Sequence, residues 1–273
     1  MENVIRYFKF WTNIASRDKV SGRAGETATS HRSPADSGVS LSVDSARVAT
    51  VLLVLAASIW IASIALTIVV PALGFDSVLL AKLSKAVDVD RERNIPAFLS
   101  MLNLLLAATL LGMITFLKQM QRAAYRGHWA CLAFGFLYMA FDEIAEIHEK
   151  IIDPMRVVLG GDNLGAFYFA WVVPGIALVV VLAVVFLRFW WNLPVRTRLQ
   201  FLIAGAIFLS GAIGVELLNG KYAEIYGKAD PWYKMLSTIE EVLEMVGVIA
   251  FVKALIDYLA TEYRKLEISP TPR

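Results

Sequence analysis

The sequence has very little of what soluble enzymes use for chemistry. One cysteine and three histidines in 273 residues exclude an intramolecular disulfide framework and a cysteine-based zinc site. The chain has no Gly-rich phosphate loop, Walker motif or nucleophile elbow. Charged residues make up only 18% of it, with 26 bases against 24 acids, and no basic patch is interleaved with stacking aromatics. We therefore expect no binding of nucleic acid.

Apolar residues are abundant instead. They make up 58% of the chain, a composition that favours a bilayer as the solvent. Six runs approach or exceed the roughly 20 apolar residues that cross a membrane: 48–74, 95–117, 128–149, 164–189, 199–218 and 235–259. The third and the sixth are the least apolar, and each carries acids near one end. Because open strands cannot satisfy their backbone in lipid, the sequence predicts an all-α integral membrane protein with a six-transmembrane-helix bundle.

The distribution of basic residues predicts the orientation. The second and the fourth loops, which join spans two to three and four to five, contain Lys and Arg but no acid, and both tails are also basic. The positive-inside rule then places both termini in the cytoplasm. We expect a multi-pass protein of the cell membrane, of the bacterial inner-membrane type, whose obligatory partner is the lipid bilayer.

Three segments follow from this pattern. Residues 1–46 are predicted to be a disordered basic cytoplasmic tail, because residues 16–46 contain almost no large apolar side chains. Within them, residues 4–14 fit either a short interfacial helix or an unattached terminus. Residues 47–260 form the transmembrane domain, and residues 261–273 a cytoplasmic C-terminal tail.

Acidic side chains stand at the ends of three apolar runs, where a membrane protein tolerates them least. They are Asp142, Glu143, Glu146, Glu149, Glu216, Glu240, Glu241 and Glu244. With both termini inside, all of them fall in the outer leaflet. The sequence therefore predicts that three separate segments bring carboxylates to one depth.

Helical geometry predicts that these acids share faces. In one straight third helix, Asp142, Glu146 and Glu149 lie on one side, and Glu240 and Glu244 on the sixth helix are four residues apart. Like charges at this spacing repel. Shared protons, a bound cation or basic partners must therefore neutralise them.

The cluster is rich in oxygen and poor in histidine, which favours Ca²⁺, Mg²⁺ or Mn²⁺ over Zn²⁺ as a bound divalent cation. In a straight helix, His148 projects about 120° away from Asp142, so capping or an interfacial position is favoured for it over ligation, although a frayed helix end could redirect it. The candidate metal-ligating residues are Asp142, Glu143, Glu146, Glu149, Glu216, Glu241, Glu244 and His148. Proton sharing among the same acids needs no metal. A further arrangement without a metal leaves Glu149, Glu216 and Glu240 in headgroups or water, while hydroxyls and Asn219 satisfy the embedded acids, which are Asp142, Glu143, Glu146, Glu241 and Glu244.

Three functions fit these residues. The leading hypothesis is a membrane protein whose outer-leaflet carboxylate cluster binds a divalent cation or protons for transport or sensing. A metal-dependent membrane enzyme acting on a lipid or a quinone is the second, although few histidines count against it and no catalytic residue is identified. The third is a structural or partner-binding bundle without a metal.

Overall fold

The computed structural model describes residues 44–268 except residues 76, 92 and 162. The predictions for residues 1–43, including the 4–14 helix, and for residues 269–273 lie outside this range. Every regular element in the described residues is helical, as predicted. In chain order they are α2 (Ser45–Ile64), η1 (Ala65–Val69), α3 (Val70–Ala72), α4 (Val78–Val87), α5 (Ile95–Met120), α6 (Arg126–Ala145), α7 (Ile147–Leu159), η2 (Gly165–Phe167), α8 (Val172–Trp191), α9 (Val195–Leu209), η3 (Ser210–Val215), α10 (Glu216–Tyr226) and α11 (Pro231–Ile268).

Within the described residues, four continuous helical segments are long and apolar enough to cross a membrane. They are Ser45–Ala72, Ile95–Met120, Val172–Trp191 and Val195–Tyr226. These segments match the first, second, fourth and fifth predicted spans. The third and sixth predicted spans correspond to α6 and α11, which are helical but fall outside this group. The structure thus supports a membrane protein, while the count of six spans and the orientation stay predictions.

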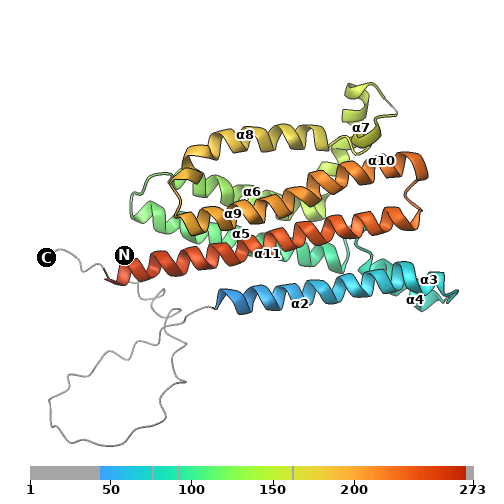
Figure 1. Ribbon diagram of the computed structural model, residues 1–273, viewed down its shortest axis with the longest axis horizontal. Helices are drawn as coiled ribbons and strands as arrows, with labels where there is room; N and C mark the ends of the chain where they lie inside the picture. The colour runs from blue at the N-terminus through green and yellow to red at the C-terminus, as the bar shows by residue number, and fades with distance from the viewer. Residues whose placement is uncertain (1–43, 76, 92, 162, 269–273) are drawn as a thin grey trace, which may run out of the picture. The chain divides into compact units, whose positions relative to one another are not determined.

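Helix α11 lies at the centre of the helical unit. It packs against α9, α2, α5, η3 and α10, and α5 also packs along α6. Figure 1 shows α11 in red beside α9 and α10 in orange, with α2 in blue along its other side. The approach to α9 is close because Gly247 carries no side chain: a Cβ there would stand 2.7 Å from the backbone nitrogen of Phe208. Fully buried Leu111, Val252 and Leu255 fill the core between these helices.

The predicted third helix is wrong as one straight element, because the chain breaks at Glu146. Glu146 adopts a left-handed conformation with φ of 53°, ending α6 and starting α7. The carboxylate of Asp142 then accepts hydrogen bonds from the backbone N–H groups of Ile147 at 2.9 Å and His148 at 3.1 Å. This side chain caps the first turn of α7 in the way that Asp caps helix N-termini. The straight acidic face predicted for Asp142, Glu146 and Glu149 therefore does not form.

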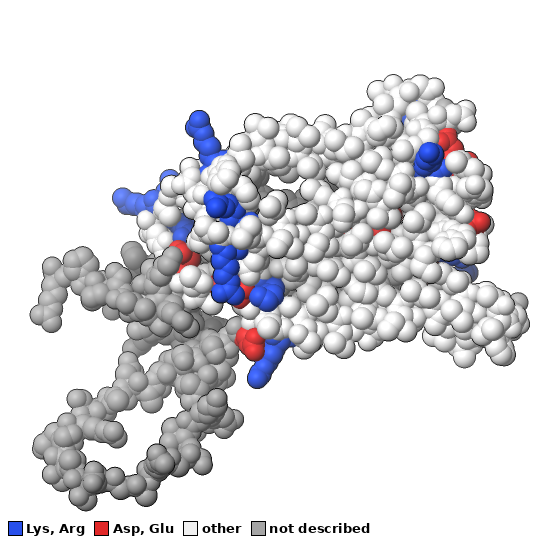
Figure 2. Space-filling model, viewed as in Figure 1, with Lys and Arg blue, Asp and Glu red and all other residues white. Residues whose placement is uncertain are grey.

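Charge is unevenly distributed over the helical unit. Figure 2 shows blue Lys and Arg gathered near the end where α2 and α9 begin, while the middle of the visible face is almost free of charge. At that end Asp257 on α11 joins three helices. Its carboxylate accepts from Ser45 Oγ at 2.5 Å, from Gln200 Nε2 at 2.8 Å and from Lys253 Nζ at 2.8 Å. An uncharged middle with charged ends is the pattern expected of a bilayer-spanning bundle.

Candidate functional site

The candidate site is built around two acids from neighbouring helices, Glu216 and Glu240, which we call the carboxyl pair. Glu216 begins α10 and is 8% exposed, and its side chain is hydrogen-bonded directly to that of Glu240 on α11. Trp171 Nε1 donates to Glu216 Oε1 at 2.8 Å. Asn219 Nδ2 approaches Glu240 Oε2 at 3.4 Å. Within the described part of the chain, the donors that reach the pair from other residues are therefore neutral.

Local structure explains why these two acids meet. The wide-turn segment η3 directly precedes Glu216, and its Gly211 lies against α11. A Cβ on Gly211 would stand 2.7 Å from the carbonyl oxygen of Glu240 and 3.1 Å from Cγ of Glu244. Only glycine permits this approach, because real Cβ atoms do not come so close to backbone oxygen. The small-residue segment thus allows α10 and α11 to bring their acids together.

From the carboxyl pair, a hydrogen-bonded path leads to the loop between α4 and α5. Asn219 Nδ2 donates to Ser237 Oγ at 3.0 Å, and Ser237 Oγ donates to Asp90 Oδ1 at 2.9 Å. Although Asp90 is an exposed residue, its carboxyl group is turned toward α11, and burial of that group raises the pKa of Asp90 above its usual range. Asn219 is 1% exposed, and its Oδ1 has no hydrogen-bond donor among the described residues. A buried acceptor of this kind has room for one more donor.

A second branch leads to the break between α6 and α7. His148 Nδ1 lies 2.6 Å from Asp142 Oδ2. The ring of His148 packs edge-on against the ring of Trp171, with centroids 5.2 Å apart. Trp171 in turn donates to Glu216. The turn at Glu146 redirects His148 toward Asp142, whereas a straight helix would have kept the two side chains apart.

The other predicted site residues divide into two groups. Glu241 and Glu244 on α11 lie close enough to Glu240 to act on it electrostatically. Glu146 Oε1 instead pairs with Arg93 Nε at 2.9 Å, and Glu149 is exposed on α7. Glu143 is half-buried near the end of α6. Part of the predicted cluster therefore converges, while Glu146 and Glu149 lie outside it.

Nothing in the described residues gathers three or more His, Cys, Asp or Glu side chains in a way that could hold a metal ion. The arrangement therefore does not support the predicted metal cluster, and the preference for Ca²⁺, Mg²⁺ or Mn²⁺ stays a prediction. Several residues of the network were not among the candidate site residues: Asp90, Trp171 and Ser237, together with Glu240, which was counted only among the acids of the cluster, and Asn219, which was named only as a partner of the acids. Trp171 could have been noticed as an indole N–H within an apolar run, since such a donor needs a partner. Asp90 lies in a loop where acids are ordinary, and no sequence signal marks it.

The four apolar helices and the charge-poor middle surface define a helical membrane protein. Comparison with protein families agrees with one folded unit over nearly the same range. Residues 46–259 match a family described as a domain of unknown function, DUF8692, and the chain belongs to this family. No curated protein and no solved structure matches the chain.

Proposed function

We propose that the protein is a six-span membrane protein, with both termini in the cytoplasm, that binds and releases protons at the carboxyl pair during transport or sensing. One observation carries the proposal: Glu216 and Glu240 hydrogen-bond to each other in a largely buried position. An ionised carboxylate can only accept hydrogen bonds, so a direct contact between two carboxyl groups needs a proton between them. The two carboxyl groups can hold two protons in all. One proton is shared between them, and the second can bind or leave as the pH changes.

Titratable groups flank the pair on two sides. Ser237 and Asn219 connect it to the exposed residue Asp90. On the other side, Trp171 separates Glu216 from the Asp142–His148 pair. Asp, Glu and His groups that flank a buried acid are the parts from which proton relays in membranes are built.

The donors around the pair favour protons over a metal ion. The indole N–H of Trp171 and the amide N–H of Asn219 point at carboxyl oxygens of the pair. A cation bound there would meet the positive ends of these N–H dipoles and would compete with them for the same lone pairs. Protons need neither a vacant coordination sphere nor further carboxylates.

Infrared difference spectroscopy of the full chain in lipid membranes tests the proposal directly. The buffer is alternated between acidic and alkaline pH, and the carbonyl stretch of protonated carboxyl groups is followed. We expect a pH-dependent band in the wild type that disappears in Glu216→Gln and in Glu240→Gln. Glu149→Gln, which removes an exposed acid, is the matched control and should keep the band.

A band that survives both substitutions would overturn the proposal, and so would a pair that stays protonated throughout. The second result would leave a structural bundle with a fixed hydrogen bond. Elemental analysis of the same samples separates protons from a cation. Stoichiometric metal in the wild type that both Gln variants lose would replace proton binding with cation binding, and metal-dependent turnover of a lipid or quinone would point to the enzyme.

A further inference from the structure

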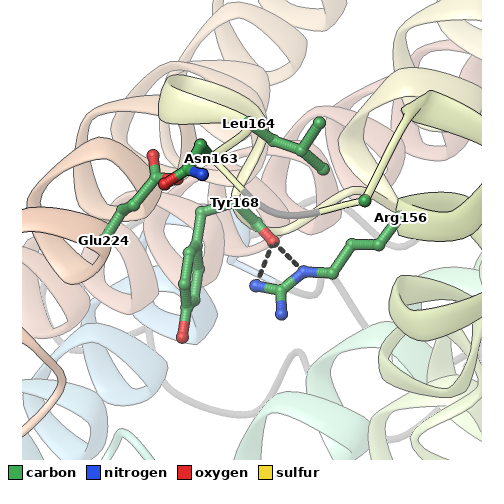
Figure 3. A pocket seen from close by; sticks show the side chains of 6 residues that line it. Arg156, Asn163, Leu164, Tyr168 and Glu224 are labelled. Atoms are coloured by element: carbon green, nitrogen blue, oxygen red, sulfur yellow. Dashed lines mark hydrogen bonds between the residues drawn. The ribbon is translucent and has the colours of Figure 1, made fainter.

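A cavity separate from the carboxyl pair lies where α7, the segment around η2 and α10 meet (Figure 3). Its volume is about 160 Å³, and it is lined by Arg156, Gly161, Asn163, Leu164, Tyr168 and Glu224. At about 30 Å³ per water molecule, it has room for about five. Pockets for drug-sized ligands are larger, at about 300 Å³ or more. The cavity therefore suits a small ligand or one end of a larger one.

One side of the cavity carries a fixed positive charge. Arg156 donates from Nε at 3.0 Å and from Nη2 at 2.7 Å to the carbonyl oxygen of Tyr168. The guanidinium carbon also lies 4.2 Å from the centre of the Tyr168 ring. These contacts use two of the five N–H groups of the guanidinium and hold its plane in place. The remaining N–H groups can bind an anion.

The other side carries a negative charge. Glu224 on α10 and Arg156 on α7 line the cavity from opposite sides, with Tyr168 between them in Figure 3. Among the ion pairs of the described residues, none includes Arg156 and none includes Glu224. Two opposite charges that face one small cavity without pairing are complementary to a ligand that carries both signs.

Apolar side chains beside the cavity fit a position at the membrane interface. On α7, Val157 and Val158 are 79% and 75% exposed, and on α10, Ile225 and Tyr226 are each 61% exposed. The polar residues of α7, such as Glu149 and Asp153, alternate with these apolar ones along the helix. Helices with one apolar and one charged face lie in the headgroup region of a bilayer. The cavity would then lie at the depth of lipid headgroups.

We propose that this cavity binds a small zwitterion of the phosphoethanolamine type, with the phosphate on Arg156 and the ammonium group on Glu224. A phosphate can accept two parallel hydrogen bonds from the guanidinium of arginine, which makes it a stronger acceptor there than a neutral polar group. A carboxylate pairs with an ammonium group. A soluble phosphoethanolamine and the headgroup of phosphatidylethanolamine share this chemistry. The site requires no titration of the carboxyl pair, so it goes beyond the function proposed above.

Isothermal titration calorimetry of the full chain in detergent tests the site with three probes. They are O-phosphoethanolamine, a short-chain phosphatidylethanolamine, and ethyl phosphate, which lacks the ammonium group. We expect Glu224→Gln to weaken the binding of the zwitterions by about tenfold or more and to leave ethyl phosphate unchanged. Arg156→Lys should weaken all three probes, because lysine keeps the charge but loses the fork.

Exposed charges at the same end supply the controls. Glu149→Gln and Lys221→Ala should leave every affinity unchanged. Binding of O-phosphoethanolamine alone identifies a soluble ligand, and binding of the lipid alone identifies a headgroup; either supports the site when Glu224→Gln weakens it. Wild-type protein that binds neither zwitterion overturns the inference. So does equal affinity in the wild type and Glu224→Gln, a variant that breaks no hydrogen bond or ion pair of the described structure.

Discussion

Helix α11 contributes to two acidic centres, Asp257 and the carboxyl pair that Glu240 forms with Glu216 of α10, and the two centres are hydrogen-bonded in different ways. Asp257 is a single acid that accepts hydrogen bonds from Ser45, Gln200 and the cationic Lys253. Arg196 Nη2 also lies 3.7 Å from its carboxylate. At the carboxyl pair two acids meet, and the donors from other residues are the neutral Trp171 and Asn219. The first centre has cations to balance its one negative charge, whereas the second has two acids and, among the described residues, no cation in hydrogen-bond contact.

This difference explains how one helix can carry acids with different tasks. An ionised carboxylate surrounded by cationic and polar donors is stable as it stands, and its removal breaks a network. Two carboxyl groups in contact cannot both be ionised without strong repulsion, so a proton takes the place of the missing cation. We therefore assign Asp257 to holding α2, α9 and α11 together, and the carboxyl pair to proton binding.

Replacing the acid by its amide should cost much more stability at Asp257 than at the carboxyl pair, and Asp257→Asn should have the largest effect of all. The amide cannot pair with Lys253 and places an N–H group among donors. We expect a loss of about 3 kcal/mol in the free energy of unfolding. Denaturation of the protein in detergent micelles, followed by the loss of helical circular dichroism, measures it.

Glu240→Gln is the matched comparison, and its stability should stay within about 1 kcal/mol of the wild type. Its amide N–H can donate to Glu216 in place of the shared proton. If Asp257→Asn and Glu240→Gln lower the free energy of unfolding equally, Asp257 and the carboxyl pair do not have the different roles assigned to them.

Gly211→Ala should have the next largest effect, because it sharpens the comparison by moving the carboxyl pair alone. The new Cβ would stand 2.7 Å from the Glu240 carbonyl oxygen, so α11 must shift away from η3. Overpacking of this kind costs about 2 kcal/mol. Thermal unfolding measures the loss. Gly205→Ala on α9 is the control, since nothing lies within 4 Å of its Cβ position, and it should be neutral or slightly stabilising.

Trp171→Phe should cost about 1 kcal/mol, the usual net value of one buried hydrogen bond. The substitution removes the N–H that reaches Glu216 and keeps an aromatic ring beside His148. Detergent unfolding provides the measurement, and Trp232→Phe at an exposed position is the control. Equal stabilities of the two variants would show that the indole donor contributes nothing to the pair.

Arg93→Ala should have the smallest effect, below about 0.5 kcal/mol. Arg93 pairs with Glu146, but its side chain is 63% exposed, so solvent screens the interaction. Unfolding compared with Lys85→Ala, another exposed base at the same end, measures it. We expect the capping of α7 by Asp142 to hold the break at Glu146 without help. A loss above about 1 kcal/mol would mean that the Arg93–Glu146 ion pair is needed as well.

Much of the fold was visible in the sequence because four runs are uniformly apolar. A common depth for Glu216, Glu240 and Glu244 was also predicted, since orientation alone puts the ends of the fifth and sixth runs at one level of the membrane. Their meeting side by side was not predicted. The break at Glu146 was not predicted either, because residues 128–149 keep a helical period throughout. Only the ability of Asp142 to cap a new helix reveals it, and capping competes with helix continuation at many acids.

Asp257 shows a second limit of sequence reasoning. Lys253 and Asp257 are four residues apart on α11, which indicates an ion pair along one helix. Contacts from Ser45 and Gln200 come from distant segments, and no pattern in the chain pairs them with it. Arg156 and Glu224 are similarly separated, so their common cavity appears only after α7 and α10 are placed.

The wide turn of η3 has a consequence for how this sequence tolerates length changes. A π-type turn accommodates one more residue than an α-helical turn, so Ser210–Val215 can be regarded as an insertion that the helix has absorbed. Deleting one residue there would restore a regular helix and leave the residues after it pointing in nearly the same directions, because the wide turn already compensates for the additional residue. Deleting one residue from the regular turn between Glu216 and Asn219 would instead rotate Asn219 and Gly220 by about 100° relative to Glu216. A one-residue gap within Ser210–Val215 is therefore compatible with the site, whereas the same gap in the first turn of α10 marks a lost site.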